Sequence, residues 1–304
     1  MRPRRGPNPG QMFEITTRSV DRRLLLRPSK EVNDIIIGIV GRAQKHIDVK
    51  LHAFVFMSTH YHILATVSSA DDMSKFIGFI NGNITRKLNK LNKRNGTGWK
   101  RRFKAIGVSK DRCTQERRLR YLLAHGVKEK LVRRAQDWPG ASSLPWLVRG
   151  KPISGTWTSF TERYHATHRQ GYVPKPGDFE TKYVLKMEPL PCWKAMSPEL
   201  WRRLVVEMIA EIEAEASEER VATHSEVLGR AAVLAADPLS QVAWQSQTRA
   251  PSVHAVDRAV RRMLKEELRL RSMAYDAASQ RFRGGEWSVV FPAGMFRPLG
   301  GFVV

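Results

Sequence analysis

Two histidines flank a tyrosine in the apolar run FMSTHYHILATV, which covers residues 56–67. The run has the alternation and β-branched content of a strand, and successive side chains of a strand point to opposite faces. His60 and His62 therefore point to one face, about 7 Å apart, while Tyr61 points to the other. That geometry suits one metal ion held by two imidazoles. A polar pair satisfied within the core is the structural alternative.

A second group of reactive residues lies in ERRLRYLLAHGVKEKLV, residues 116–132. Tyr121 and His125 are four residues apart, so they stack on one face of the predicted helix. A tyrosine beside a potential ligand, among many Lys and Arg residues, suits attack of the phenol on a phosphodiester. A metal ion would polarise the phosphate and stabilise the departing 3′ oxygen. The alternative is that Tyr121 packs with the neighbouring leucines in the core.

Hydrophobic periodicity predicts the elements that must position these residues. A Ser29 cap begins the first helix, a tight turn at Ser58–Thr59 joins two strands, and Gly126 is expected to end the third helix. The order β-α-β-β-α-β-α predicts an α+β fold with a ferredoxin-like, split-βαβ antiparallel sheet. The predicted strands are residues 11–20, 49–57, 59–67 and 102–109, and the predicted helices are 29–46, 71–94 and 113–127.

The second half of the chain has a different composition. Residues 141–195 are rich in Pro, Gly and Trp, which predicts a long ordered connector between a domain at 1–140 and a mainly helical domain at 196–304. In the last domain we predict a helix capped by Ser197, a second near 224–236, a long basic helix over 252–282, and a closing segment of short strands or an extended arm. The last two helices could alternatively form a helix-turn-helix motif.

Charge is unevenly distributed along the chain. The net charge of +23 divides into 31 − 11 = +20 for residues 1–150 and 21 − 18 = +3 for residues 151–304. A polyanion partner would explain this asymmetry, because each phosphate neutralised by Lys or Arg releases a condensed counterion. An acidic membrane surface is the alternative, but the first half has no long basic amphipathic helix. We therefore expect a nucleic acid partner.

The composition also bounds the compartment. With 42% hydrophobic residues the chain is globular, and no apolar run approaches the roughly 18 residues of a membrane span. Residues 1–10 lack the apolar run of a secretion signal. Cys113 and Cys192 are far apart and form no CxxC pair, which is typical of a reduced environment. We expect a cytoplasmic, nucleoid-associated protein without a membrane partner.

The segment LNKLNKRNGTGWKRRFK, residues 88–104, interleaves basic side chains with two aromatic ones. Basic groups can follow a nucleic acid backbone while aromatic rings stack on unpaired bases. Trp99 and Phe103 could instead belong to the core. Together with the basic cluster after the first strand and the basic helix, this segment gives the predicted DNA-binding residues: Arg18, Arg22, Arg23, Lys93, Arg94, Trp99, Lys100, Arg101, Arg102, Lys104, Arg117 and Arg120.

Four motifs occur in a fixed order: MSTHYHIL, GWKRRFKAI, RYLLAHGVKEKLV and DWPGASS. In this order and spacing, residues 10–145 resemble the single-tyrosine HUH transposases, especially the REP-associated group. The resemblance implies the HUH nuclease fold, His60 and His62 as the metal pair, Tyr121 as the nucleophile, and a Mg²⁺ or Mn²⁺ ion. It also implies an endonuclease that nicks and rejoins single-stranded, hairpin-bearing DNA through a covalent 5′-phosphotyrosine, in transposition and recombination of REP elements.

The sequence departs from that family four residues after the tyrosine. The family usually has Asn or Gln there, commonly followed by Pro, whereas this chain has His125–Gly126. We predict that His125 is the third metal ligand, which favours Mn²⁺. Alternatively, His125 interacts with the helix dipole, or catalysis is lost and the chain is a DNA-binding regulator. An RNA-binding or replication-initiator protein is a further alternative, and the oligomeric state, monomer or homodimer, stays open.

Overall fold

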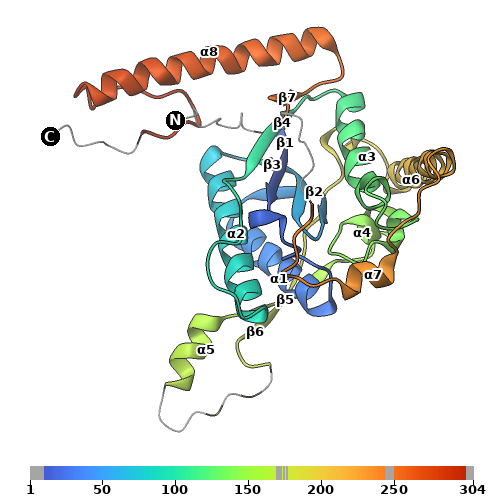
Figure 1. Cartoon of the computed structure of the whole chain (residues 1–304). Coiled ribbons are helices and arrows are strands. Elements are labelled where there is room, and N and C mark those ends of the chain that lie inside the picture. The colour runs from blue at the N-terminus through green and yellow to red at the C-terminus, as the bar shows by residue number, and fades with distance from the viewer. Residues whose placement is uncertain (1–9, 169–172, 174, 176, 244–249, 299–304) are drawn as a thin grey trace.

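A five-stranded sheet lies at the centre of the computed structural model, which describes residues 10–168, 173, 175, 177–243 and 250–298 (Figure 1). The strand order is β2-β3-β1-β4-β7, and the first four strands are mutually antiparallel. The predicted ferredoxin-like α+β fold is thus confirmed. The strands are β1 (Met12–Arg18), β2 (Val49–Phe56), β3 (His60–Val67), β4 (Lys104–Val108) and β7 (Val253–His254).

The two-residue strand β7 departs from the predicted antiparallel sheet. It comes from the C-terminal part of the chain and pairs in parallel with β4, in the register Gly107↔Val253 and Val108↔His254. The sequence from 252 onward was expected to be helical, and the helix instead begins after this strand. The C-terminal region therefore contributes directly to the sheet that carries the predicted site.

One face of the sheet is covered by α1 (Lys30–His46) and α2 (Ala70–Leu91). Both begin at a serine whose side chain accepts a backbone N–H, Ser29 for α1 and Ser69 for α2. Alternate strand residues supply this core, because every second side chain of a strand faces the same layer. The buried cluster includes Phe13, Ile15, Phe54, Tyr61, Ile63, Ile36, Ile39, Phe76 and Ile80.

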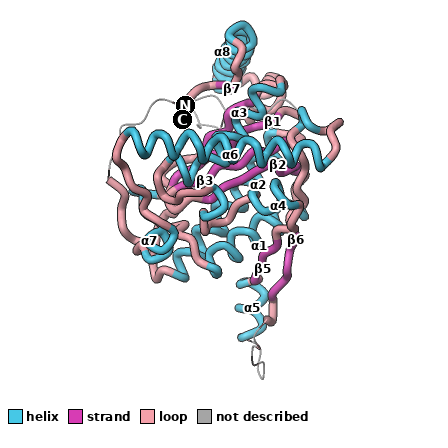
Figure 2. The backbone as a smooth tube through the Cα atoms, turned by 90° about the vertical axis from the view of Figure 1, so that its right-hand side faces the viewer, coloured by secondary structure: helices cyan, strands magenta, loops and turns pink. Residues whose placement is uncertain are grey.

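The opposite face is covered by α3 (Arg112–Lys128), α4 (Leu144–Arg149) and α6 (Pro198–Ala222), and α6 runs across it in Figure 2. The short helix α7 (Arg230–Ala235) joins the same cluster through Val233. The predicted cap of α6 at Ser197 is confirmed. The buried residues of this second core include Met12, Leu64, Val108, Leu119, Leu122, Trp193, Trp201, Val205 and Ile212.

Gly126 does not end α3, so the predicted cap was wrong. The helix continues to Lys128, and the backbone N–H of Glu129 closes its last turn. Gly126 is buried where a Cβ atom would lie 3.2 Å from Val132 Cγ2 and 3.5 Å from Trp138 Cε3. The glycine therefore permits close packing, and His125 sits inside a regular helical turn.

The predicted connector contains its own elements: α4, a hairpin of β5 (Ser154–Thr158) and β6 (Glu180–Val184), and α5 (Phe160–Thr167). The His52 ring fastens it to β2, with Nδ1 2.8 Å from Pro189 O and Nε2 2.9 Å from Thr66 Oγ1. Burial lowers the pKa of His52 to about 4, so this ring is neutral. Short 3-10 helices lie at Val20–Arg22, Ala135–Asp137 and Pro191–Trp193. The division at residues 140 and 195 stays a prediction.

The long basic helix is confirmed as α8 (Arg258–Arg283). The helix-turn-helix interpretation is wrong, because residues 236–257, including β7, separate α7 from α8. Residues 284–298 form no strand and run beside α8, where the Tyr275 and Phe291 ring centroids are 5.6 Å apart. The rest of the predicted closing arm, 299–304, lies outside the described residues. Within the described residues, no helix combines the length and apolarity needed to span a membrane.

Gly38→Ala should destabilise the fold even though alanine favours helices. A Cβ atom at Gly38 of α1 would lie 2.1 Å from the carbonyl oxygen of Thr156 in β5, so the hairpin must move away. We expect a loss of about 1–3 kcal/mol in the free energy of unfolding, measured by urea denaturation. Gly82→Ala in α2 is the matched control: nothing lies within 4 Å of its Cβ position, so a gain of up to about 1 kcal/mol is expected. Equal effects of the two substitutions would contradict the prediction.

Candidate metal and nucleophile site

Three histidines meet on the face of the sheet that α3 covers. His60 and His62 are two residues apart on β3, and His125 lies in the last turns of α3. The Nε2 atoms of His60 and His125 are 2.7 Å apart, and one ligand atom from each of the three rings lies within 4.8 Å of the others. The structure therefore brings together the three predicted metal ligands. Leu119 and Leu122 hold α3 there, since both are buried against the sheet.

A buried carboxylate supports His62 from behind. Glu14 of β1 is 2% exposed, and its Oε1 lies 2.8 Å from His62 Nδ1. Its Oε2 lies 2.7 Å from Arg118 Nη2 and 2.8 Å from His254 Nε2. Because a carboxylate only accepts hydrogen bonds, His62 Nδ1 carries the proton, and in the neutral ring Nε2 keeps a lone pair for a metal.

The partners of the buried Glu14 carboxylate keep it ionised. Burial alone would raise the pKa of Glu14, but contacts with His254 and His62 and the charge of Arg118 lower the pKa well below its usual range. The site thus contains one fixed negative charge. The Glu14 carboxylate contacts the candidate metal ligands through His62. This is how a carboxylate supports a histidine ligand.

The other two rings are also set up as neutral ligands. His60 Nδ1 lies 2.9 Å from Thr59 Oγ1, which leaves Nε2 directed at His125. Burial lowers the pKa of His60 well below its usual range, and the proximity of His62 and His125 acts in the same direction. Burial also lowers the pKa of His125, to about 3. Neutral imidazole is the form that binds metal ions, so the donor set fits a divalent cation.

Tyr121 lies against this histidine cluster. Its ring centroid is 5.1 Å from that of His125 and 5.4 Å from that of His62, and the Arg118 guanidinium carbon lies 4.3 Å from the ring centre. Burial and the charge of Glu14 raise the pKa of Tyr121, while Arg118 and Arg18 act in the opposite direction. The phenol is therefore protonated near neutral pH and needs help to act as a nucleophile.

Tyr61 lies on the other face, as the strand pattern predicts. Its hydroxyl donates a hydrogen bond of 2.9 Å to Asn81 Oδ1 of α2, and burial raises its pKa. The ring is fully buried within the α1–α2 core. The two tyrosines are thus separated by the sheet, and only Tyr121 contacts the histidines.

Several of the predicted DNA-binding residues lie beside the site. Arg18 of β1 pairs with His60 of β3. The backbone N–H of Lys100 donates to the carbonyl oxygen of Arg18 at 3.0 Å. This contact fastens the basic loop after α2 to the end of the sheet where His60 lies. Five of the predicted basic residues on this loop and β4 are exposed: Lys93, Lys100, Arg101, Arg102 and Lys104. Arg117 of α3 is exposed as well.

Arg120 does not present its charge to a ligand. Its Nη1 and Nη2 atoms lie 2.7 Å from carboxylate oxygens of Glu211 and Glu215 on α6. The guanidinium therefore docks α6 onto α3, and the structure favours this role over the predicted DNA contact. Sequence reasoning missed it because the two carboxylates lie about 90 residues further along the chain.

Trp99 and three arginines are also engaged within the chain. The Trp99 indole N–H donates to Asn81 O at 3.0 Å and its ring packs edge-on against Tyr61, which favours the core alternative over base stacking. Arg94 Nη1 donates to Asn89 Oδ1 at 2.8 Å and so fixes the loop that it was expected to offer to DNA. Two others donate to backbone carbonyls of the C-terminal half: Arg22 to Ala243 and Arg23 to Leu239.

Three residues of the site were not predicted as part of it: Glu14, Arg118 and His254. Glu14 leaves a signal in the sequence, since a carboxylate between Phe13 and Ile15 of a strand has to be satisfied inside the protein. Arg118 is one helical turn before Tyr121 and so shares its face. His254 leaves no such signal, because its strand contains only two residues.

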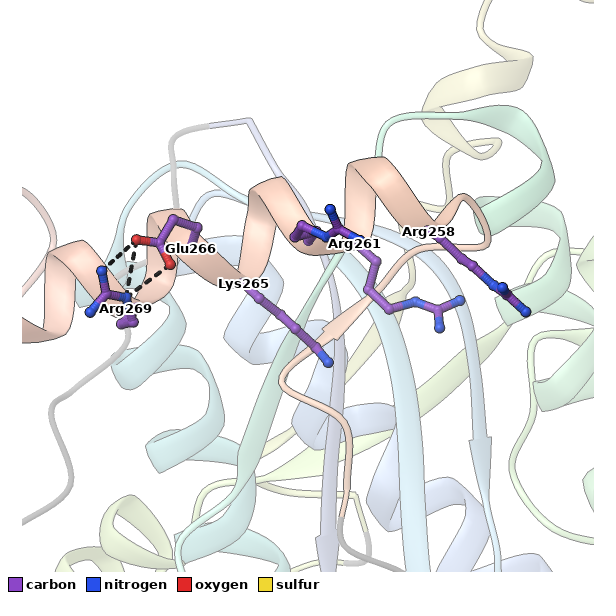
Figure 3. A pocket seen from close by; sticks show the side chains of 6 residues that line it. Arg258, Arg261, Lys265, Glu266 and Arg269 are labelled. Carbon is purple, nitrogen blue, oxygen red and sulfur yellow. Dashed lines mark hydrogen bonds and ion pairs between the residues drawn. The ribbon is translucent and has the colours of Figure 1, made fainter.

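A separate surface hollow lies on α8. It measures about 400 Å³ and is lined by one helix face: Arg258, Arg261, Arg262, Lys265, Glu266 and Arg269 (Figure 3). It contains none of the histidines or tyrosines described above. The hollow is thus distinct from the histidine site, and its lining is strongly basic.

A ferredoxin-like sheet with two histidines on one strand, and a helix over the same face that carries a tyrosine, is the arrangement implied for the HUH class. Residues 12–122 match the family model described as IS200-like transposase, which confirms the resemblance to the single-tyrosine transposases over this part of the chain. The match ends at the residue after Tyr121, so residues 123–304 lie outside it. A comparison with curated protein sequences gives no match.

Two solved structures are similar to part of the chain. One is a REP-associated tyrosine transposase bound to a REP hairpin, with 19% identity, a TM-score of 0.40, and coverage of 47% of this chain and 82% of that chain. The other is a transposase structure from Deinococcus radiodurans R1, with 17% identity, a TM-score of 0.29, and coverage of 38% and 92%.

Proposed function

We propose that this chain is a metal-dependent, single-tyrosine DNA transposase or endonuclease that nicks and rejoins single-stranded, hairpin-bearing DNA. The observation that carries the proposal is the contact of Tyr121 with the His60, His62 and His125 cluster on one face of the sheet. The family match over residues 12–122 supports the same class. All four side chains lie together within this one chain.

In the proposed reaction, the phenolic oxygen of Tyr121 attacks the phosphorus of a phosphodiester. An O–P bond to Tyr121 forms, the bond from phosphorus to the 3′ oxygen breaks, and the DNA strand leaves with a 3′ hydroxyl. The phenolic proton passes to water and the leaving oxygen takes a proton from solvent. Attack of another 3′ hydroxyl on the phosphotyrosine reverses these steps, which rejoins the strand and restores the phenol.

The residues around Tyr121 have distinct roles in this proposal. Arg118 lies over the phenol ring and, with Arg18, favours development of negative charge on its oxygen, against the effect of burial. Glu14 holds His62 with Nε2 directed toward the other rings. When bound, a divalent ion on the three histidines would polarise the phosphate and stabilise the departing oxygen.

The exposed basic loop supplies the proposed path for the DNA. The loop is joined to the sheet by the hydrogen bond from the Lys100 N–H to the carbonyl oxygen of Arg18, which pairs with His60. Exposed basic side chains lie at this contact and just after it: Lys100, Arg101, Arg102 and Lys104. Contacts of these side chains with DNA phosphates would place an adjacent scissile bond near Tyr121. Such contacts position the DNA without recognising its bases. We expect this activity at the nucleoid, where the DNA substrate is located.

Tyr121→Phe should abolish the covalent protein–DNA adduct while DNA binding is kept, because only the hydroxyl is removed. The measurement is a denaturing gel after incubation of the full chain with labelled hairpin DNA and Mn²⁺ or Mg²⁺. Tyr61→Phe is the matched control: its hydroxyl faces α2, so adduct formation should persist. An adduct that persists in Tyr121→Phe contradicts the assignment. A wild-type chain that binds tightly and forms no adduct selects a DNA-binding regulator on the same scaffold.

His125→Ala should weaken Mn²⁺ binding by about tenfold or more, since a ligand is lost, and calorimetric titration of the full chain measures this. Three imidazoles make a softer site than two imidazoles and an amide oxygen, so the wild type should prefer Mn²⁺ to Mg²⁺. His125→Asn or His125→Gln should restore Mg²⁺-supported cleavage. His46→Ala, at the exposed end of α1, is the control and should bind Mn²⁺ normally. Unchanged Mn²⁺ affinity in His125→Ala would show that His125 is not a ligand.

A further inference from the structure

The C-terminal region reaches the site through β7. His254 is held there by the backbone: Ser109 N–H donates to its carbonyl oxygen at 2.9 Å, next to the pairing of Val253 with Gly107. Two residues further on, the Val256 N–H donates to Thr114 Oγ1 of α3 at 2.9 Å. The strand is therefore fixed to both β4 and α3. This part of the chain lies well beyond the residues 12–122 that match the transposase family model.

The His254 side chain is 11% exposed and points at Glu14. Its Nε2 lies 2.8 Å from Glu14 Oε2, while Glu14 Oε1 lies 2.8 Å from His62 Nδ1. The three residues thus form a continuous relay of contacts from β7 to a candidate metal ligand. Arg118 contacts the same Oε2 from α3, so two elements grip one carboxylate oxygen.

We propose that His254 is a positioning residue for the metal site. By contacting Oε2 from β7 while Arg118 contacts it from α3, His254 fixes the plane of the Glu14 carboxylate. The carboxylate in turn orients the His62 ring with Nε2 toward His60 and His125. This inference rests on the proposed metal-binding function, and it makes the C-terminal strand a structural part of the catalytic site. Partners of this kind commonly change metal affinity tenfold to a hundredfold when removed.

His254→Ala should lower the Co²⁺ affinity of the full chain by about tenfold or more and change the visible absorption of bound Co²⁺, because His62 is no longer held. Both are measured by titration with CoCl₂, with circular dichroism to confirm the fold. His254→Gln should restore both properties, since its amide Nε2 can donate to Oε2 at similar reach. His254→Asn is one bond shorter and should not restore them.

Gly38→Ala is the destabilising control: it disturbs the packing of α1 against β5, away from the histidines, so it should lower the unfolding temperature and leave the Co²⁺ affinity and spectrum unchanged. A folded His254→Ala variant with wild-type affinity and spectrum would overturn the proposal. So would equal behaviour of His254→Gln and His254→Asn. A wild-type chain that binds no Co²⁺ would instead contradict the proposed metal site itself.

A second, independent observation concerns α8. No side chain between residues 258 and 270 is buried, so this half of the helix contributes nothing to a core. Yet Arg258, Arg262, Lys265 and Arg269 recur at spacings of four, three and four, which places them on one face. Figure 3 shows Arg258 and Lys265 extending from the same side of the helix, while Glu266 holds Arg269. The packing of the protein gives no reason for this basic stripe.

We propose that this stripe binds the double-stranded stem of the DNA hairpin through its phosphates, a proposal that rests on the proposed function. Arg258, Arg262 and Lys265 have no hydrogen-bond or ion-pair partner within the described part of the chain. The stripe is roughly 16 Å long at 1.5 Å per residue, which matches several phosphates of a duplex. Because α8 directly follows β7, its first turn begins beside the site.

Replacing the three residues together, Arg258→Gln, Arg262→Gln and Lys265→Gln, should lower affinity for hairpin DNA by tenfold or more. The slope of log affinity against log salt should become shallower by about 2 to 3, because up to three phosphate contacts are lost. Fluorescence anisotropy at several salt concentrations measures both. Arg281→Gln, whose residue is paired with Glu286 at the far end of α8, is the matched control. Unchanged affinity and slope in the triple variant would overturn the proposal, whereas a wild type without salt-dependent DNA affinity would contradict the proposed function.

Discussion

The Glu14 carboxylate is the group on which the arrangement of the site depends. A buried charge is tolerated only when it is paired, and Glu14 is paired with groups from three segments far apart in sequence: β3, α3 and β7. Each of these segments must be in place before the negative charge of the carboxylate is fully paired. The same requirement that stabilises the packing of α3 and β7 against the sheet therefore also fixes the orientation of His62.

His60 and His62 can therefore be both a polar pair that is hydrogen-bonded within the core and a pair of metal ligands. Each ring has two nitrogens. The Nδ1 atoms are satisfied by Thr59 and Glu14, as a structural polar seam requires. The Nε2 side remains directed toward the cluster with His125. The structural contacts are thus what prepare the rings as ligands, since a ligating histidine normally donates its other N–H to a partner.

Local pattern predicted most of the half that contains the proposed site. Strand alternation correctly placed His60 and His62 opposite Tyr61, and helical spacing correctly placed Tyr121 on the face of His125, because both depend only on near neighbours in sequence. What the sequence did not reveal depends on distant contacts. Gly126 is typical of a helix end, but Val132 and Trp138 require a small residue there. Arg120 belongs to a basic helix in sequence, but carboxylates of α6 neutralise it.

The same distinction applies to charge. By sequence, the C-terminal half is nearly neutral, which directs attention to the first half as the DNA-binding part. The structure shows that two helices of the C-terminal half contribute opposite net charges. Helix α6 carries a net charge of 3 − 7 = −4 and turns two of its carboxylates toward Arg120, whereas α8 carries 8 − 3 = +5 with its basic side chains largely exposed. Charges paired inside the fold do not attract a polyanion, so the exposed basic residues of the loop before β4 and of α8 are the ones that can contact one. Strand β7 directly precedes α8 and contains the residue that contacts Glu14, so the proposed DNA-binding helix and the proposed metal site are joined at His254.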